Sequence, residues 1–127
     1  MDVAAREGSH EAIAGLWEGA SEIYASRLTY VEARAAIGAK ARTARRYRKQ
    51  LLAAKSELEA RWEVVEIVEL NELVRQVAGL AADTHRLRGA DAVHLASAAV
   101  LGSGVTMVSR DARLRAAALA AGIDVAP

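Results

Sequence analysis

Apolar and polar residues alternate along the chain in patterns that predict helices separated by short strands. Apolar residues three or four positions apart indicate helices, and short apolar runs rich in β-favouring residues indicate strands. The predicted helices cover residues 9–20, a segment that begins at Thr29, and residues 44–61, 70–86, 90–101 and 112–121. The predicted strands cover residues 22–26, 62–68, 105–109 and 123–125.

This alternation predicts an α/β fold in which a central parallel sheet carries helices on both faces. The helix at 90–101 is rich in Ala and apolar around most of its girth, so we expect it to be central. A chain of 127 residues without a linker or an internal repeat is the size of one domain, and we expect a single domain over residues 1–127.

Three acidic residues lie at turns of the predicted fold. Glu32 follows Thr29 in a capping-box pattern, Asp91 opens a helix, and Asp111 follows the apolar run that ends at residue 109. Each residue taken alone is explained by helix capping or by the helix dipole. In a parallel sheet, however, such turns meet at the carboxyl ends of the strands, where the three carboxylates can converge.

Composition narrows the chemistry that such a site can perform. The chain has no Cys and three His, which excludes thiolate sites and favours Mg²⁺, Mn²⁺ or Ca²⁺ on oxygen ligands over Zn²⁺. Converging carboxylates repel one another unless a cation neutralises them, and a bound cation can activate water against a phosphate. The sequence shows no signal core and no apolar run of membrane-spanning length, so we expect a cytoplasmic protein without a membrane partner.

The formal net charge of +1 implies no bulk affinity for nucleic acid, but one segment is strongly basic. The predicted helix at 44–61 and the residues before it carry Arg42, Arg45, Arg46, Arg48, Lys49 and Lys55. Such a face can contact phosphates, although a solvated helix flank is the more usual explanation. Both interpretations stay open.

Three segments closely resemble PIN-domain proteins, and specifically the VapC toxins of type II toxin–antitoxin pairs. They read SRLTYVEARAAI (26–37), LRGADAVHLASAA (87–99) and VTMVSRDARLRAAALAAGIDV (105–125). The segments ADAVHLA and SRDARL are specific to this family, whereas TYVEARAAI alone is weak evidence for it. The resemblance extends from about Arg6 onward.

The resemblance implies a PIN-like three-layer α/β/α fold with catalytic and metal-binding roles for Glu32, Asp91 and Asp111. Ser109 matches a supporting hydroxyl residue near the last acid. The implied activity is endoribonuclease cleavage of RNA that depends on Mg²⁺ or Mn²⁺. A cognate VapB-like antitoxin would silence it, and a homodimer is expected from the family.

Two arginines and one histidine near these acids have open roles. Arg88 and Arg110 can contact RNA phosphate or pair with a carboxylate. His94 can bind a metal or transfer a proton, but a packed and hydrogen-bonded core histidine is the more usual case. Trp17 and Trp62 are expected in the core or at an interface.

The match departs from the family at the N-terminus, where family members begin with an apolar strand that ends in a metal-binding Asp. Here the first residues already match the helix that follows this strand, and Asp2 is no substitute for the Asp. In the family the strand is central, so its absence would remove ladder partners from both neighbours. A start site placed too far downstream is the favoured explanation. The alternatives are a strand from another chain and an inactive relative.

Two hypotheses follow for the activity. The chain is a metal-dependent ribonuclease toxin, or it is a PIN-like protein that binds an antitoxin or RNA without cutting. For the 127-residue chain we expect weak or no nuclease activity.

Overall fold

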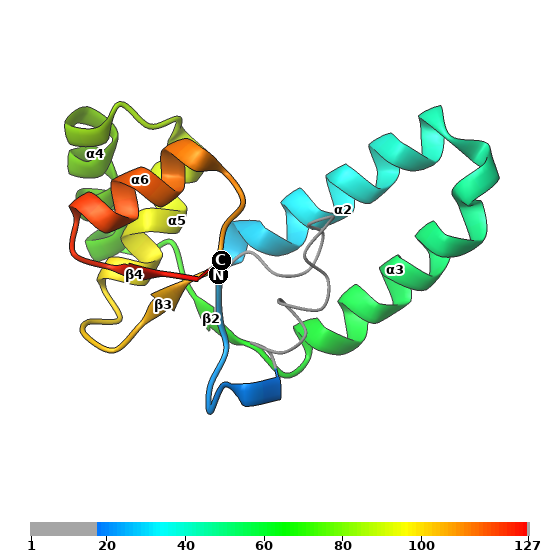
Figure 1. Ribbon diagram of the computed structural model, residues 1–127, viewed down its shortest axis with the longest axis horizontal. Coiled ribbons are helices and arrows are strands. Elements are labelled where there is room, and N and C mark those ends of the chain that lie inside the picture. Colours follow the sequence, from blue (N-terminus) through cyan, green and yellow to red (C-terminus); the bar gives the residue numbers. More distant parts are fainter. Residues whose placement is uncertain (1–17, 127) are drawn as a thin grey trace.

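The computed structural model describes residues 18–126, which form short parallel strands and longer helices (Figure 1). In chain order the elements are β1 (Tyr24–Ser26), α2 (Arg27–Thr43), the 3₁₀ turn η1 (Arg45–Tyr47), α3 (Arg48–Trp62), β2 (Glu66–Val68), α4 (Glu72–His85), α5 (Gly89–Ala99), β3 (Thr106–Met107), α6 (Ala112–Ala120) and β4 (Asp124–Val125). No helix within 18–126 is long and apolar enough to cross a membrane.

The strands pair in parallel, as predicted, but as two separate two-stranded sheets. β1 pairs with β2, with Tyr24 opposite Glu66, and β3 pairs with β4, with Met107 opposite Val125. Among residues 18–126, neither β1 nor β3 has a second strand beside it.

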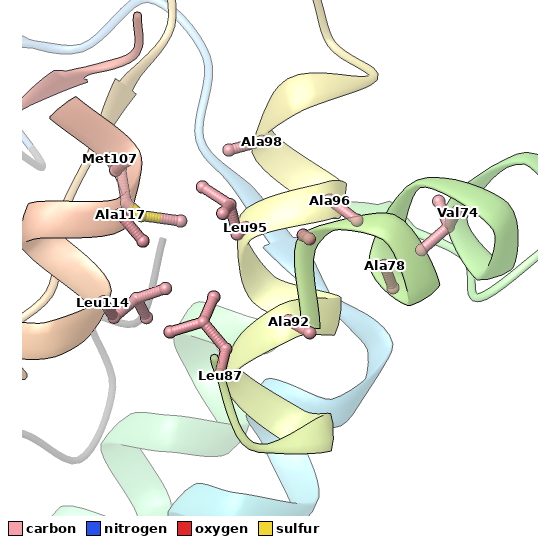
Figure 2. Close-up of a cluster of buried hydrophobic side chains, with 12 residues drawn as sticks. Val74, Ala78, Leu87, Ala92, Leu95, Ala96, Ala98, Met107, Leu114 and Ala117 are labelled. Atoms are coloured by element: carbon pink, nitrogen blue, oxygen red, sulfur yellow. The ribbon is translucent and has the colours of Figure 1, made fainter. Parts of the chain in front are cut away.

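Helix α5 lies at the centre of the molecule, as its apolar girth predicted. It packs against α4 on one side and α6 on the other, and it also contacts β1 (Figure 2). Leu95 and Ala96 are almost completely buried, and Leu114 of α6 and Met107 of β3 close the same core. Small side chains let three helices approach closely here, because each Ala adds little volume between the helix axes.

Helices α2 and α3 form a long hairpin that projects from the other side of the molecule (Figure 1). Leu58 of α3 and Ala33 of α2 are buried where the two helices meet. The rings of Tyr30 and Trp62 pack at a centroid distance of 5.3 Å near the base of the hairpin. The prediction of an interface or core position for Trp62 agrees with this contact, whereas Trp17 lies outside the described residues.

The structure corrects several details of the sequence interpretation. The predicted strand at 62–68 is confirmed only at Glu66–Val68, because Trp62 still belongs to α3. The helix predicted at 44–61 is divided into η1 and α3, and within it Tyr47 and Leu52 are 38% and 56% exposed. The predicted helix at 9–20 lies almost wholly outside the described residues.

Candidate functional site

Glu32 lies in the second turn of α2, which begins earlier than the sequence predicted. The N-cap is Ser26, whose side chain accepts a hydrogen bond from the backbone N–H of Leu28 at 3.2 Å. Thr29 is a buried residue inside the first turn and not the cap. The capping-box prediction for Thr29 and Glu32 is therefore wrong, because Ser26 already provides the cap where the strand ends.

The Glu32 carboxylate forms a hydrogen bond with the imidazole of His94 in the central helix α5. The atoms in contact are Oε1 of Glu32 and Nε2 of His94. A carboxylate only accepts, so Nε2 carries the hydrogen. The side chain of His94 is 3% exposed and that of Glu32 is 43% exposed, so the pair leads from the core to the surface. The prediction of a packed, hydrogen-bonded His94 is confirmed.

Asp91 stands one helical turn before His94, in the first turn of α5. Residues three positions apart share a helix face, with about 5–6 Å between their Cβ atoms. Since His94 holds Glu32, the carboxylates of Glu32 and Asp91 lie beside the same face of α5. Asp91 is half-buried, and within residues 18–126 its carboxylate has no hydrogen bond or ion pair. It is thus available to a ligand.

Asp111 is the N-cap of α6, as predicted. Its Oδ1 accepts a hydrogen bond from the backbone N–H of Leu114 at 2.8 Å. Ser109 is buried, and its hydroxyl accepts from the backbone N–H of Asp111 at 3.1 Å. The guanidinium of Arg115 donates to the carbonyls of Ser109 and Ala126, which ties the loop before α6 to the end of β4. The loop around Asp111 is therefore held firmly, and the cap uses the Oδ1 oxygen of its carboxylate.

The structure brings Glu32 and Asp91 to one face of α5 but does not gather all three acids. Among residues 18–126, no group of three or more His, Asp or Glu side chains lies close enough to hold a metal ion. Carboxylate oxygens are the right donors for a hard divalent cation. In the part of the chain that is described, however, they do not form a complete cation site.

Two buried polar atoms beside this face have no hydrogen-bond partner within residues 18–126. They are Oγ1 of Thr29 in α2 and Nδ1 of His94 in α5. A buried polar atom without a partner costs free energy, about 1–3 kcal/mol, so native proteins keep few of them. The sequence does not point to either atom, because Thr29 has the pattern of a cap and Glu32 and His94 are 62 positions apart in the chain.

The arginine side chains near the site differ in whether they form ion pairs with acids of residues 18–126. Arg27, at the start of α2, donates two hydrogen bonds to Glu69 beyond β2, at 2.7 and 2.5 Å. This contact lowers the pKa of the Glu69 carboxyl and raises the pKa of the Arg27 guanidinium. Arg88 and Arg110 are exposed, and neither forms an ion pair with an acid of residues 18–126. Both remain free to meet an anionic ligand.

The arrangement of helices around parallel strands, with Glu32 in the second turn of α2 and an acid at the start of both α5 and α6, is that of a PIN-type fold. The family model described as "PIN domain" matches residues 1–120, and the chain belongs to this family. The resemblance to PIN-domain proteins is thereby confirmed.

Within the family, the chain is a VapC-like protein. It is 45% identical over 113 residues to Ribonuclease VapC45 of Mycobacterium tuberculosis (strain CDC 1551 / Oshkosh), which covers 88% of this chain and 78% of the relative. It has the same identity and coverage with Ribonuclease VapC49 of Mycobacterium tuberculosis (strain ATCC 25618 / H37Rv).

Proposed function

We propose that this protein is an endoribonuclease that acts as the toxin of a VapBC-type toxin–antitoxin pair. The observation that carries the proposal is the 45% identity, over 88% of the chain, to two proteins named as VapC ribonucleases. The RNA substrate and a VapB-like antitoxin follow from that likeness. A single PIN-like domain over residues 1–127, a homodimer and a cytoplasmic location, where RNA is abundant, belong to the same proposal.

The proposed site is built on Glu32, Asp91 and Asp111, with Ser109 in support. Its support is the shared face of α5, where Glu32 is held through His94 and Asp91 is unpaired within the described residues. Ser109 and the cap of α6 fix the loop that carries Asp111. Arg88 and Arg110 are proposed to contact RNA phosphate, since exposed guanidinium groups match phosphate oxygens.

Mg²⁺ or Mn²⁺ is the proposed cofactor, in keeping with the general dependence of PIN nucleases on divalent metals. The oxygen donors of this chain suit both ions. The described residues alone do not supply a group of three donors, so the affinity for either ion is expected to be weak. This expectation is tested by titrating Mn²⁺ into the protein and following the free ion by electron paramagnetic resonance.

A PIN-like protein that binds RNA or an antitoxin without cutting is the second candidate. The absence of a three-residue metal group among residues 18–126 favours it. The two candidates share the fold and the partners and differ in whether a phosphodiester bond breaks. They are therefore separated by an assay of cleavage and not by an assay of binding.

The test uses the purified 127-residue chain with total RNA, in the presence of Mg²⁺, Mn²⁺ or EDTA. The ribonuclease proposal expects at least weak cleavage by this chain, which EDTA stops and the Asp91→Asn variant lacks. Asn keeps the size of the side chain and removes the charge that a cation needs. If the wild-type chain leaves RNA intact with both metals while still binding it, the second candidate replaces the first.

Asp111 allows a matched control, because its structural and chemical roles can be separated. Asn is as good an N-cap as Asp, so Asp111→Asn should keep α6 folded while changing the charge. Loss of cleavage in Asp111→Asn, with unchanged thermal unfolding, would assign the residue to the reaction. Unchanged cleavage in this variant would restrict Asp111 to capping.

A further inference from the structure

The α2–α3 hairpin concentrates positive charge in a chain that is otherwise acidic. Between Glu32 and Glu57 the sequence holds eight of the 17 Lys and Arg and none of the 16 Asp and Glu. Because the whole chain has a formal net charge of only +1, the rest of the protein must carry a net negative charge. The hairpin is therefore the part of the surface to which an anionic polymer would be drawn.

The charge is greatest at the outer end of the hairpin, which we call the arm tip. The arm tip comprises Arg42 at the end of α2, Arg45 and Arg46 in η1, and Arg48 and Lys49 at the start of α3. All five side chains are exposed, and none forms an ion pair with an acid of residues 18–126. Elsewhere Arg27, Arg34, Arg61 and Arg75 are each paired with a glutamate.

An aromatic side chain stands among these cations. Tyr47 is 38% exposed, and the guanidinium of Arg46 lies 4.8 Å from the centre of its ring. An exposed aromatic ring beside guanidinium groups can stack on a nucleic-acid base while the cations meet the phosphates. This pairing distinguishes the arm tip from an ordinary solvated helix flank.

The arm tip lies within reach of an RNA that occupies the proposed site. Glu32 and Arg42 are on the same helix, and ten residues at 1.5 Å each separate them by about 15 Å. An extended RNA strand of several nucleotides spans this distance. Helix α2 thus connects Glu32, near its start, with the cations at its end.

We propose that the arm tip binds the phosphate backbone of the RNA substrate, with Tyr47 as a stacking surface for a base. This proposal rests on the proposed ribonuclease function for the identity of the polymer. In this proposal the arm tip provides affinity for RNA. Bond cleavage takes place at the proposed site of Glu32, Asp91 and Asp111. The open alternative from the sequence, a phosphate-binding basic face, is the one that the structure favours.

An acidic protein segment is the competing partner, and the surface fits it less well. The centre of a protein–protein interface is apolar and poor in charged residues. Between Arg42 and Lys49 the only large apolar or aromatic side chain is Tyr47, which stands between Arg46 and Arg48 in the sequence. This composition matches the polar, strongly basic character of nucleic-acid interfaces.

The experiment measures binding without cleavage, with fluorescein-labelled single-stranded RNA of mixed sequence in EDTA. The test variant combines Arg45→Gln, Arg46→Gln and Arg48→Gln, and affinity is followed by anisotropy across a range of salt concentrations. Each lost phosphate contact should reduce the slope of log affinity against log salt by about 0.7, so three should reduce it by about 2. At low salt the variant should bind at least about tenfold more weakly.

A matched control removes the same number of charges elsewhere, through Arg75→Gln, Arg86→Gln and Arg113→Gln. These residues are exposed and lie on α4, just after it and on α6, away from the hairpin. A rescue variant carries Lys in place of Arg45, Arg46 and Arg48. It should restore the salt dependence, because Lys also neutralises phosphate.

The outcomes separate this proposal from the proposed function. Loss of the salt slope in the arm-tip variant alone, with rescue by Lys and an unchanged circular dichroism spectrum, supports the arm tip as the RNA-binding surface. An equal loss in the control, or no loss in either variant, overturns it. Retained RNA affinity in the arm-tip variant, with lost affinity for an acidic peptide, also overturns it in favour of a protein partner. If the arm tip binds RNA but no metal supports cleavage, the ribonuclease proposal fails and the arm tip stands.

Discussion

The two sides of the molecule are stabilised by different means. Within residues 18–126, the twelve residues of the hydrophobic core cluster lie from Val74 to Ala118, on α4, α5, α6, β3 and the loop before α5. The hairpin of α2 and α3 contributes Ala33 and Leu58 as buried apolar residues, and its outer part is exposed. Helices in one small protein thus depend on burial in one region and on surface contacts in the other.

This difference explains why the hairpin can carry so much charge. A buried helix must present small apolar side chains to its neighbours, as α5 does. A helix pair that packs along one narrow line leaves most of its surface to water, where charged residues cost little. At its base the hairpin is held by Arg34, which donates to Glu59 at 2.9 Å and to the Tyr30 hydroxyl at 2.6 Å.

The largest contrast is expected from leucine substitutions in the two regions. Leu95 is 2% exposed in α5, whereas Leu52 is 56% exposed in α3. Leu95→Ala should lower the free energy of unfolding by about 2–5 kcal/mol, because it leaves a cavity in the core. Leu52→Ala should change it by less than about 0.5 kcal/mol. Urea unfolding followed by circular dichroism measures both changes. Comparable losses of stability in the two variants would contradict the view that burial stabilises the core region and not the outer hairpin.

The contact between Glu32 and His94 joins the hairpin to the core, so breaking it tests how far the two regions are coupled. His94→Ala should destabilise the protein by about 2 kcal/mol, because it removes a hydrogen bond to a charged group. Amide hydrogen exchange should increase most in the first turns of α2. Unchanged exchange there, with faster exchange only in α5, would show that the contact does not anchor the hairpin.

Loss of the N-cap of α6, within the core region, should have a smaller effect on stability. Asp111→Ala removes the acceptor for the Leu114 N–H and should cost about 1 kcal/mol, whereas Asp111→Asn should cost almost nothing. Thermal unfolding of the two variants measures the difference. Equal destabilisation would mean that the charge of Asp111, and not its cap, stabilises the helix.

The smallest effect is expected at the exposed pair of Arg27 and Glu69, which links the start of α2 to the segment after β2. The guanidinium lowers the pKa of the Glu69 carboxyl in the folded protein. The stabilisation is therefore present above the ordinary pKa of glutamate and is lost as the pH falls through the lowered folded value. In Arg27→Gln the pKa of Glu69 should return toward its ordinary value in an NMR titration. An unchanged pKa would show that the pair does not persist in solution.

Local patterns were enough to predict most of the fold. Asp111 as a cap, the apolar girth of α5 and the short apolar runs at β1 and β4 are signals contained within a few residues, and the structure confirms them. The start of α2 was misplaced because Ser26 and Thr29 are both good capping residues. Only the pairing of β1 with β2, which fixes where the extended chain ends, decides between them.

The site was less accessible to sequence reasoning, because it depends on contacts between distant residues. The placement of Asp91 and Asp111 at helix starts follows from local rules, and family resemblance singled out Glu32 as a third acid. The hydrogen bond between Glu32 and His94 arises from the packing of α2 and α5, which no local pattern encodes. The separation of the strands into two pairs depends on tertiary structure in the same way.

The two parallel strand pairs also differ in the length of chain that each must close. Thr106 and Asp124 pair across 18 positions, with one helix between them, whereas Tyr24 and Glu66 pair across 42, with the whole hairpin between them. Each doubling of a loop adds about 0.6 kcal/mol of closure entropy, and contacts between distant residues slow folding. The β3–α6–β4 unit should therefore form early in folding, and the hairpin should dock late. When the complete chain refolds, the basic arm would thus take its final position only after the core has condensed.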